Sequence, residues 1–139
     1  AVIFNQFDQL PNHLWHYGIT GPALQEAFNL MAEEQPQTSI NLALVLFSSG
    51  SAGTLGAGSY IKEQFPQCKV GVGEALQCPT ITENGFGGHR IEGIGDKHIP
   101  WIHNLRDTDV AVAVDDEIVI RSSGSLTKQR AKNGLKRPG

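Results

Sequence analysis

The feature that most constrains the fold is a nearly continuous apolar run that leads into a glycine-rich turn. Residues 40–47 read INLALVLF, and residues 48–58 are mostly serine, glycine and alanine before a helix expected to end near Phe65. A short apolar run bounded by turn residues is typical of a strand buried on both faces of a parallel sheet. The pattern therefore predicts a strand, a turn and a helix in an α/β protein.

Two further stretches have the length and composition of strands. Residues 69–75 read KVGVGEA, residues 108–114 read TDVAVAV, and the acidic residues 115–117 are suited to begin a helix. Strands that alternate with helices indicate right-handed βαβαβ units. We therefore predict a three-layer α/β fold around an open, mostly parallel sheet. Residues 76–106 are rich in glycine, have little periodicity and are expected to be irregular.

A short strand and a helix are expected before the apolar run. Residues 2–7 predict the strand, and residues 8–19 predict an irregular or partly helical link. Thr20 is suited to cap a helix that opens with Gly21 and Pro22. Four apolar residues at helical spacing predict one buried stripe on this helix: Leu24, Ala27, Phe28 and Met31.

The turn after the apolar run is a candidate anion site. It reads SSGSAGTLGAG and joins the carboxyl end of a strand to the amino end of a helix. The first N–H groups of a helix lack intrahelical acceptors and the helix dipole is positive there, so a phosphate group fits. The turn is not a Walker loop, because no Gly-Lys-Ser/Thr closes it. From these residues alone, an anion site and a purely structural turn are both open.

Three motifs taken together are more specific. Residues 50–54 (GSAGT) resemble a GTGGT phosphate loop, residues 5–22 resemble an NQFxNPANPxxHYxxTGPE segment, and residues 92–100 resemble an EGIGxxFIP loop. All three belong to the cysteine synthase and cystathionine β-synthase family of fold-type II pyridoxal-phosphate enzymes. The resemblance covers residues 2–120 and implies a fragment of the large domain of such an enzyme.

The resemblance also implies a role for each matching residue. Pyridoxal phosphate would be the cofactor, with its phosphate held by the loop at residues 50–54. Gln6 would help to hold the substrate carboxylate, and Gly93, Ile94 and Gly95 would line the mouth of the site. The phosphate-binding residues implied are Gly50, Ser51, Ala52, Gly53 and Thr54.

The chain departs from the family pattern at several positions. Ala52 stands where the family has glycine, so a positive φ there would strain the backbone. Leu10 and His13 replace two prolines, and Ala23 replaces a glutamate. The family's Schiff-base lysine, its substrate-carboxylate loop and the serine facing the pyridine nitrogen have no match within residues 2–120. We therefore expect a truncated protein without the parent β-replacement or β-elimination activity, and we assign no catalytic residue.

Charge separates the end of the chain from the rest. Residues 121–139 carry six of the eleven Lys and Arg and no acid, although the net charge of the whole chain is −3. We interpret residues 1–120 as the α/β domain and residues 121–139 as a basic tail that is disordered or translated out of frame. If the reading frame of the tail is shifted by one nucleotide, its possible codons can encode a sequence similar to the helix expected after the acidic residues 115–117. Residues 123–130 also match, more loosely, the family segment that carries the Schiff-base lysine, and this match would instead indicate a circular permutation.

Several functions stay open at this point. The chain reads as an inactive relative of the enzyme, a module that binds pyridoxal phosphate or a phosphate-like anion, an oligomeric interaction protein, or one half of an enzyme completed by another chain. An incompletely covered sheet predicts a homodimer or larger, and we expect no contact with nucleic acid or membrane. Cys68 and Cys78 lack CxxC spacing and read as reduced thiols of a cytoplasmic protein. The candidate metal ligands match no zinc spacing, so no metal is predicted: His89, Asp96, His98 and His103.

Overall fold

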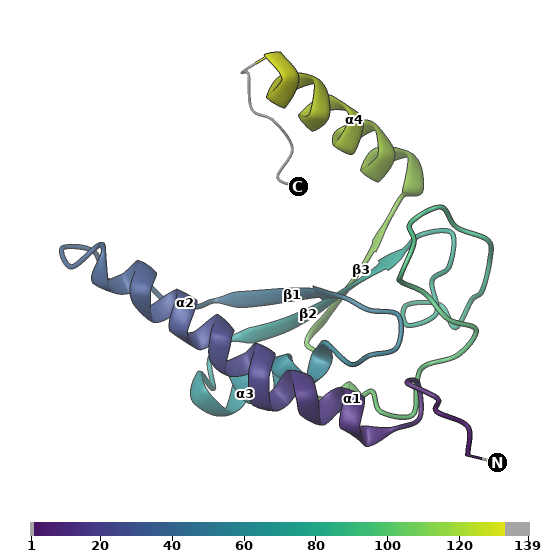
Figure 1. The fold of residues 1–139 in the computed structure, drawn as a ribbon, viewed down its shortest axis with the longest axis horizontal. Coiled ribbons are helices and arrows are strands. Elements are labelled where there is room, and N and C mark those ends of the chain that lie inside the picture. Colours follow the sequence, from purple (N-terminus) through teal and green to yellow (C-terminus); the bar gives the residue numbers. More distant parts are fainter. Residues whose placement is uncertain (1, 133–139) are drawn as a thin grey trace.

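The structure, a computed structural model, describes residues 2–132 of the chain and the side chains of residues 2–124. Figure 1 shows a small sheet with helices along one side and a last helix that projects from the far end. The elements in chain order are α1 (Leu10–Trp15), the π-helical turn η1 (His16–Thr20), α2 (Gly21–Glu33), β1 (Leu44–Ser48), α3 (Leu55–Gln64), β2 (Lys69–Ala75), the 3-10 turn η2 (Leu105–Asp107), β3 (Val110–Val114) and α4 (Asp116–Lys132).

The three strands form a parallel sheet in the order β1-β2-β3. Val45 pairs with Val70, and Val72 pairs with Ala111, so these apolar side chains share one face. The α/β class and the parallel order predicted from the sequence are confirmed. β2 has the predicted bounds, whereas β1 and β3 begin later than expected, at Leu44 and Val110.

Helix α3 packs against one face of the sheet. A Cβ at Gly58 would lie 2.8 Å from Val70 Cγ1 and 3.2 Å from Phe47 Cε2, so the helix backbone lies very close to β1 and β2. α1 and α2 lie on the same side of the sheet as α3 (Figure 1). The described residues thus supply two of the three expected layers. One cluster of the buried apolar core joins this helix layer to the sheet and contains Ala52, Leu55, Val70, Val72 and Ile102.

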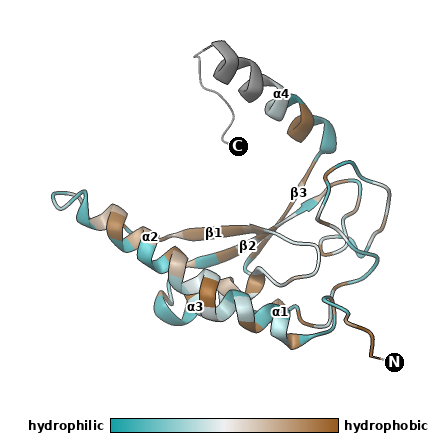
Figure 2. Ribbon diagram, in the orientation of Figure 1, coloured by the Kyte–Doolittle hydropathy of each residue, from teal (hydrophilic) through white to brown (hydrophobic). Residues whose placement is uncertain are grey.

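The opposite face of the sheet is apolar and open among the described residues. Leu44 is 50% exposed and Leu46 is 58% exposed, although the sequence predicted a strand buried on both faces. That prediction was wrong for these residues because the described chain places no helix over them. Figure 2 shows β1 as one of the most hydrophobic elements of the fold.

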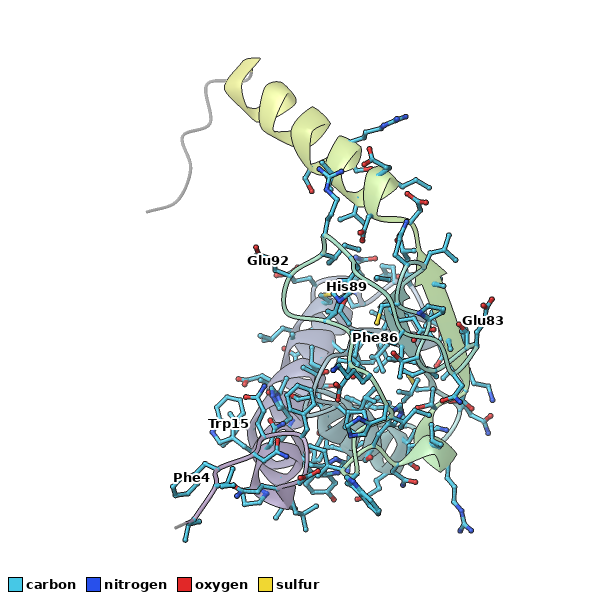
Figure 3. All side chains as sticks on the ribbon, turned by 90° about the vertical axis from the view of Figure 1, so that its right-hand side faces the viewer. Phe4, Trp15, Glu83, Phe86, His89 and Glu92 are labelled. Carbon is cyan, nitrogen blue, oxygen red and sulfur yellow. The ribbon has the colours of Figure 1, made fainter. Side chains whose placement is uncertain are left out.

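The chain before α1 is not a strand, contrary to the prediction for residues 2–7. Asn5 Oδ1 accepts a hydrogen bond from the backbone N–H of Phe7, and Asn5 O accepts one from Asp8. This side-chain bond to the backbone stabilises a turn in place of an extended segment. Phe4 is 87% exposed and points away from the molecule (Figure 3).

Helix α2 starts at Gly21 as predicted, but Thr20 does not cap it. The chain already arrives in helical conformation from η1, with φ of −69° at Thr20, and the Thr20 hydroxyl instead lies 2.9 Å from His16 Nδ1. The predicted buried stripe is also largely open, because Met31 is 55% exposed. Together with residues 40–45, the stripe lines an apolar groove beside β1.

Helix α4 continues to Lys132, where the sequence analysis expected a tail without regular structure. Its start is held by Gln77, whose Oε1 accepts from Asp116 N, and no proline interrupts residues 116–132. Residues 133–139 of the expected tail lie outside the described residues. Within the described part of the chain, no helix has the length and apolar character to span a membrane.

Candidate functional site

The nine predicted site residues meet at one cavity of about 350 Å³. They come from three segments that are far apart in sequence: the chain before α1, the β1–α3 loop and the irregular segment after β2. Three further residues complete the lining, namely Phe7, His16 and Ser48. Small-molecule sites have volumes of roughly 300–1,000 Å³, so the cavity has room for a small ligand.

The β1–α3 loop and the EGIG loop lie in direct contact. Gly95 N donates a hydrogen bond of 3.1 Å to Ser49 O. A Cβ at Gly50 would lie 2.9 Å from Gly93 O, so only glycine allows this approach. Gly93 and Gly95 have φ of 80° and 83°, which glycine adopts without strain. The glycines of both motifs therefore form one wall of the cavity.

The irregular segment after β2 is held in place by a buried carboxylate. Glu74 accepts hydrogen bonds from Ile81 N at 2.8 Å, from Thr82 N at 3.0 Å and from the Thr82 hydroxyl at 2.6 Å. Further along, the Thr80 hydroxyl donates to Asp96 O at 2.6 Å, next to the EGIG motif. Glu92 of that motif points into solvent (Figure 3). The segment is irregular, as predicted, but its path is fixed at both contacts.

The β1–α3 loop presents unpaired backbone donors. The N–H groups of Leu55, Gly56 and Ala57 donate to the carbonyls of residues 52–54, which closes the first turn of α3. By contrast, the five N–H groups of residues 50–54 have no acceptor among the described residues. Residues 50–54 all line the cavity, so this run of free donors is available to an acceptor from outside the chain.

The two loop hydroxyls differ in their availability. Thr54 Oγ1 donates to Ser48 O at 3.3 Å and is thus already used within the chain. Ser51 Oγ accepts from Asn12 Nδ2 at 3.0 Å, which leaves its own proton unused. Of the two loop hydroxyls, the described structure leaves that of Ser51 available to a ligand.

Ala52 has the positive φ that the comparison with glycine predicts. Its φ is 64°, in the left-handed region that costs a residue with a Cβ about 1–2 kcal/mol. The Ala52 side chain is 1% exposed and belongs to the core cluster with Leu55 and Val72. The methyl group therefore packs into the core and does not fill the space before the loop.

His16 is a lining residue that the sequence analysis left without a role. Burial, and then the neighbouring His13, lower the pKa of His16, so the imidazole is neutral at pH 7. No lysine or arginine lines the cavity in the described part of the chain. An anion here would be held by N–H and O–H dipoles. His16 could have been found from the sequence, because it belongs to the HY pair of the first motif.

No known family profile matches the chain, but individual proteins do. The chain is 33% identical to cysteine synthase B of Campylobacter jejuni over 87 residues, which cover 62% of this chain and 28% of that protein. It is 30% identical to a probable cysteine synthase of Bacillus subtilis over 113 residues, which cover 81% of this chain and 34% of that protein. The chain spans about a third of the length of these curated relatives.

Solved structures give the same result at the level of the fold. A hydrogen sulfide-producing enzyme of Fusobacterium nucleatum superposes with a TM-score of 0.65 and 33% identity over 79% of this chain and 31% of that one. An O-acetylserine-dependent cystathionine β-synthase of Helicobacter pylori superposes with a TM-score of 0.62 and 27% identity over 81% and 33%. In motifs, sequence and fold, the chain belongs to the cysteine synthase family and corresponds to a segment of its fold-type II members.

Proposed function

We propose that the 139 residues form the phosphate-binding part of a cysteine-synthase-like site for pyridoxal phosphate. The observation that carries this proposal is the run of five backbone N–H groups at residues 50–54 without an acceptor among the described residues. Their position before α3 adds the positive end of a helix dipole. The close approach of Gly50 to Gly93 leaves no room for a side chain at position 50 of the loop.

Each wall of the cavity has its own task in this proposal. The loop at residues 50–54 and the Ser51 hydroxyl hold the phosphate group, and Gln6 in the segment before α1 donates its side-chain amide to a substrate carboxylate. Gly93, Ile94 and Gly95 limit access of water at the mouth. Pyridoxal phosphate, when bound, supplies the electron sink for chemistry at an amino acid.

A titration with inorganic phosphate tests the site directly. We expect phosphate to shift the backbone amide signals of residues 50–56 and to leave those of β2 unchanged. Dipoles and neutral donors hold the anion, so the affinity should be weak, with about 1–3 kcal/mol gained beyond solvation. Ser51→Ala should weaken the binding, whereas Ser39→Ala, at an exposed position outside the cavity, should not. Saturating phosphate without any shift in residues 50–56 would contradict the proposal.

Gly53→Val is not a suitable variant for testing the loop. A Cβ at Gly53 would overlap with Asn12 Oδ1, so the substitution displaces Asn12 as well as altering the loop. A loss of binding in this variant would not separate the loop from its neighbour. Ser51→Ala removes one donor without adding volume and is the sharper test.

We also propose that the chain of 139 residues alone does not catalyse β-replacement or β-elimination. The lysine that the family uses for covalent attachment of the cofactor has no counterpart by motif within residues 2–120. Incubation of the purified chain with pyridoxal phosphate, O-acetylserine and sulfide should yield no cysteine above the buffer background. Cysteine formation by the purified chain would contradict this, and formation only after a second chain is added would favour an enzyme in two parts.

Self-association is a second candidate property, and a specific observation favours it. The open sheet face carries Leu44 and Leu46, and β1 is an edge strand with no neighbour on its outer side among the described residues. Exposed apolar faces and open strand edges both promote association. We propose a homodimer or larger assembly in the cytoplasm, where the free thiols of Cys68 and Cys78 stay reduced.

A further inference from the structure

Asn12 contacts two walls of the cavity without lining it. Its Nδ2 lies 2.9 Å from the carbonyl oxygen of Gln6 and 3.0 Å from Ser51 Oγ. Its Oδ1 occupies the space that a Cβ at Gly53 would need, so the amide rests directly on the loop backbone. The side chain thus joins the segment before α1 to the β1–α3 loop, which lies 39 residues further along the chain at Ser51.

The partners of Asn12 determine which way its amide points. The Gln6 carbonyl can only accept, so the NH2 group must face it, and the second proton of that group then reaches Ser51 Oγ. Ser51 is the acceptor in this bond. A hydroxyl that accepts still has its own proton to donate, and Ser51 Oγ has no other partner among the described residues.

We propose that Asn12 is a positioning residue that directs the Ser51 hydroxyl proton into the cavity. Because the Asn12 amide occupies the acceptor side of Ser51 Oγ, the proton is left for an anionic oxygen at the loop. A hydrogen bond to an ionised acceptor is shorter and stronger than a neutral one, so this orientation contributes to anion affinity. The inference rests on the proposed phosphate site and adds the residue that orients one of its donors.

Asn12→Asp tests the orientation with almost no change in size. The carboxylate only accepts, so the Ser51 hydroxyl would turn toward it, and the added negative charge would repel an anion. We expect the dissociation constant for inorganic phosphate, measured from the amide shifts of residues 50–56, to rise about tenfold or more, because a hydrogen bond to a charged group is lost. Asn29→Asp adds the same charge at an exposed position on α2 and should change the constant by less than about twofold, since solvent and salt screen it.

A double-mutant cycle separates an effect through Ser51 from a general loosening of the loop. We expect Asn12→Ala to weaken phosphate binding about threefold or more when Ser51 is present, and to have almost no further effect in the Ser51→Ala background. Equal losses in both backgrounds would overturn the proposal, as would an Asn12→Asp variant that binds phosphate like the wild type. The amide shifts of β2 report whether each variant is folded, and the alanine cycle decides if Asn12→Asp unfolds.

The wild-type titration distinguishes this inference from the proposed site itself. If the wild-type chain shows no phosphate-dependent shift at residues 50–56, both the site and the role of Asn12 are wrong. If the wild type binds phosphate and both Asn12 variants bind it equally well, the site stands and only the positioning role is wrong. Weaker binding in the Asn12 variants, coupled to Ser51, supports both.

Discussion

Ala52 combines a strained backbone with a well-packed side chain, and the two effects nearly cancel. Ala52→Gly would remove about 1–2 kcal/mol of left-handed strain. It would also lose a buried methyl group worth about 0.8 kcal/mol, and it would add roughly 0.5–1 kcal/mol of unfolded-state entropy. We expect urea unfolding to show a stability within about 1 kcal/mol of the wild type. Phosphate binding should be unchanged, because the methyl group points into the core.

Ala57→Gly is the matched control for this prediction. Ala57 is also fully buried, but it lies in α3 with ordinary helical geometry, so no strain is relieved. The loss of a methyl group and of helix propensity together should cost about 2 kcal/mol. If Ala52→Gly were destabilising by the same amount, the φ of 64° would carry no strain. A clear gain in phosphate affinity would mean that the methyl group obstructs the loop.

Individual residues show how far the sequence alone could reach into the site. All nine predicted residues line one cavity, because motifs with fixed local geometry specify their own loops. Sequence alone could not predict that the Ser51 hydroxyl proton is unused and that the Thr54 hydroxyl is engaged. Both depend on contacts in space, with Asn12 Nδ2 and with Ser48 O respectively. The pKa shift of His16 depends in the same way on burial by other segments.

At the scale of the elements, Asp109, which directly precedes β3, links β3 to β2 and α3. Its carboxylate accepts from Val70 N at 2.8 Å and pairs with Lys62 Nζ at 2.8 Å and Lys69 Nζ at 3.3 Å. The Lys62 ammonium first, and then the Val70 N–H, lower the pKa of Asp109 from 3.8 to about 2. A carboxyl with a lowered folded-state pKa stabilises the fold above the unfolded pKa, and this contribution is lost as pH falls from about 4 to about 2.

Asp109→Asn should therefore flatten the acid side of the stability profile. The free energy of unfolding from urea titrations at pH 5, 4 and 3 should fall more steeply for the wild type than for the variant. Lys62→Met should raise the pKa of Asp109, because the ammonium group that pairs with it at 2.8 Å is removed. The carbon-13 signal of the Asp109 carboxyl group follows this pKa. A wild type and Asp109→Asn that lose stability in parallel over this range would contradict the role of Asp109.

The elements also show where sequence patterns failed. The bounds of β2 were predicted residue for residue, since KVGVGEA is flanked on both sides by turn residues. The expected strand at residues 2–7 is absent because Asn5 closes a turn, and apolar residues alone do not provide a pairing partner. The continuation of α4 to Lys132 was missed because a basic, weakly periodic sequence can still be helical when acids begin it and no proline breaks it.

At the scale of the whole molecule, the apolar pattern predicts a sheet covered on both faces, whereas the described residues cover only one face. The run INLALVLF has the composition of a strand buried on both faces, and one face is indeed packed by α3. The other face leaves Leu44 and Leu46 in solvent among the described residues. A pattern of apolar residues records how a strand is buried in its final assembly, and it does not say which chain or segment provides the cover.

The open face leads to the last prediction, that Leu46→Lys reduces self-association. Leu46 lies over Gly71, where a Cβ would come within 2.7 Å of Leu46 Cδ1 and 3.5 Å of Leu44 Cδ1, so the two leucines cover this part of the open face. Burying a leucine contributes about 1.5–3 kcal/mol, so replacing it with a charge should weaken association by about tenfold or more per contact. Sedimentation velocity at micromolar concentration should show the wild type as dimers or larger and Leu46→Lys shifted toward monomers. Leu105→Lys, at an exposed leucine in η2, should sediment like the wild type, and a wild-type chain that is already monomeric would show that this face is not an interface between copies.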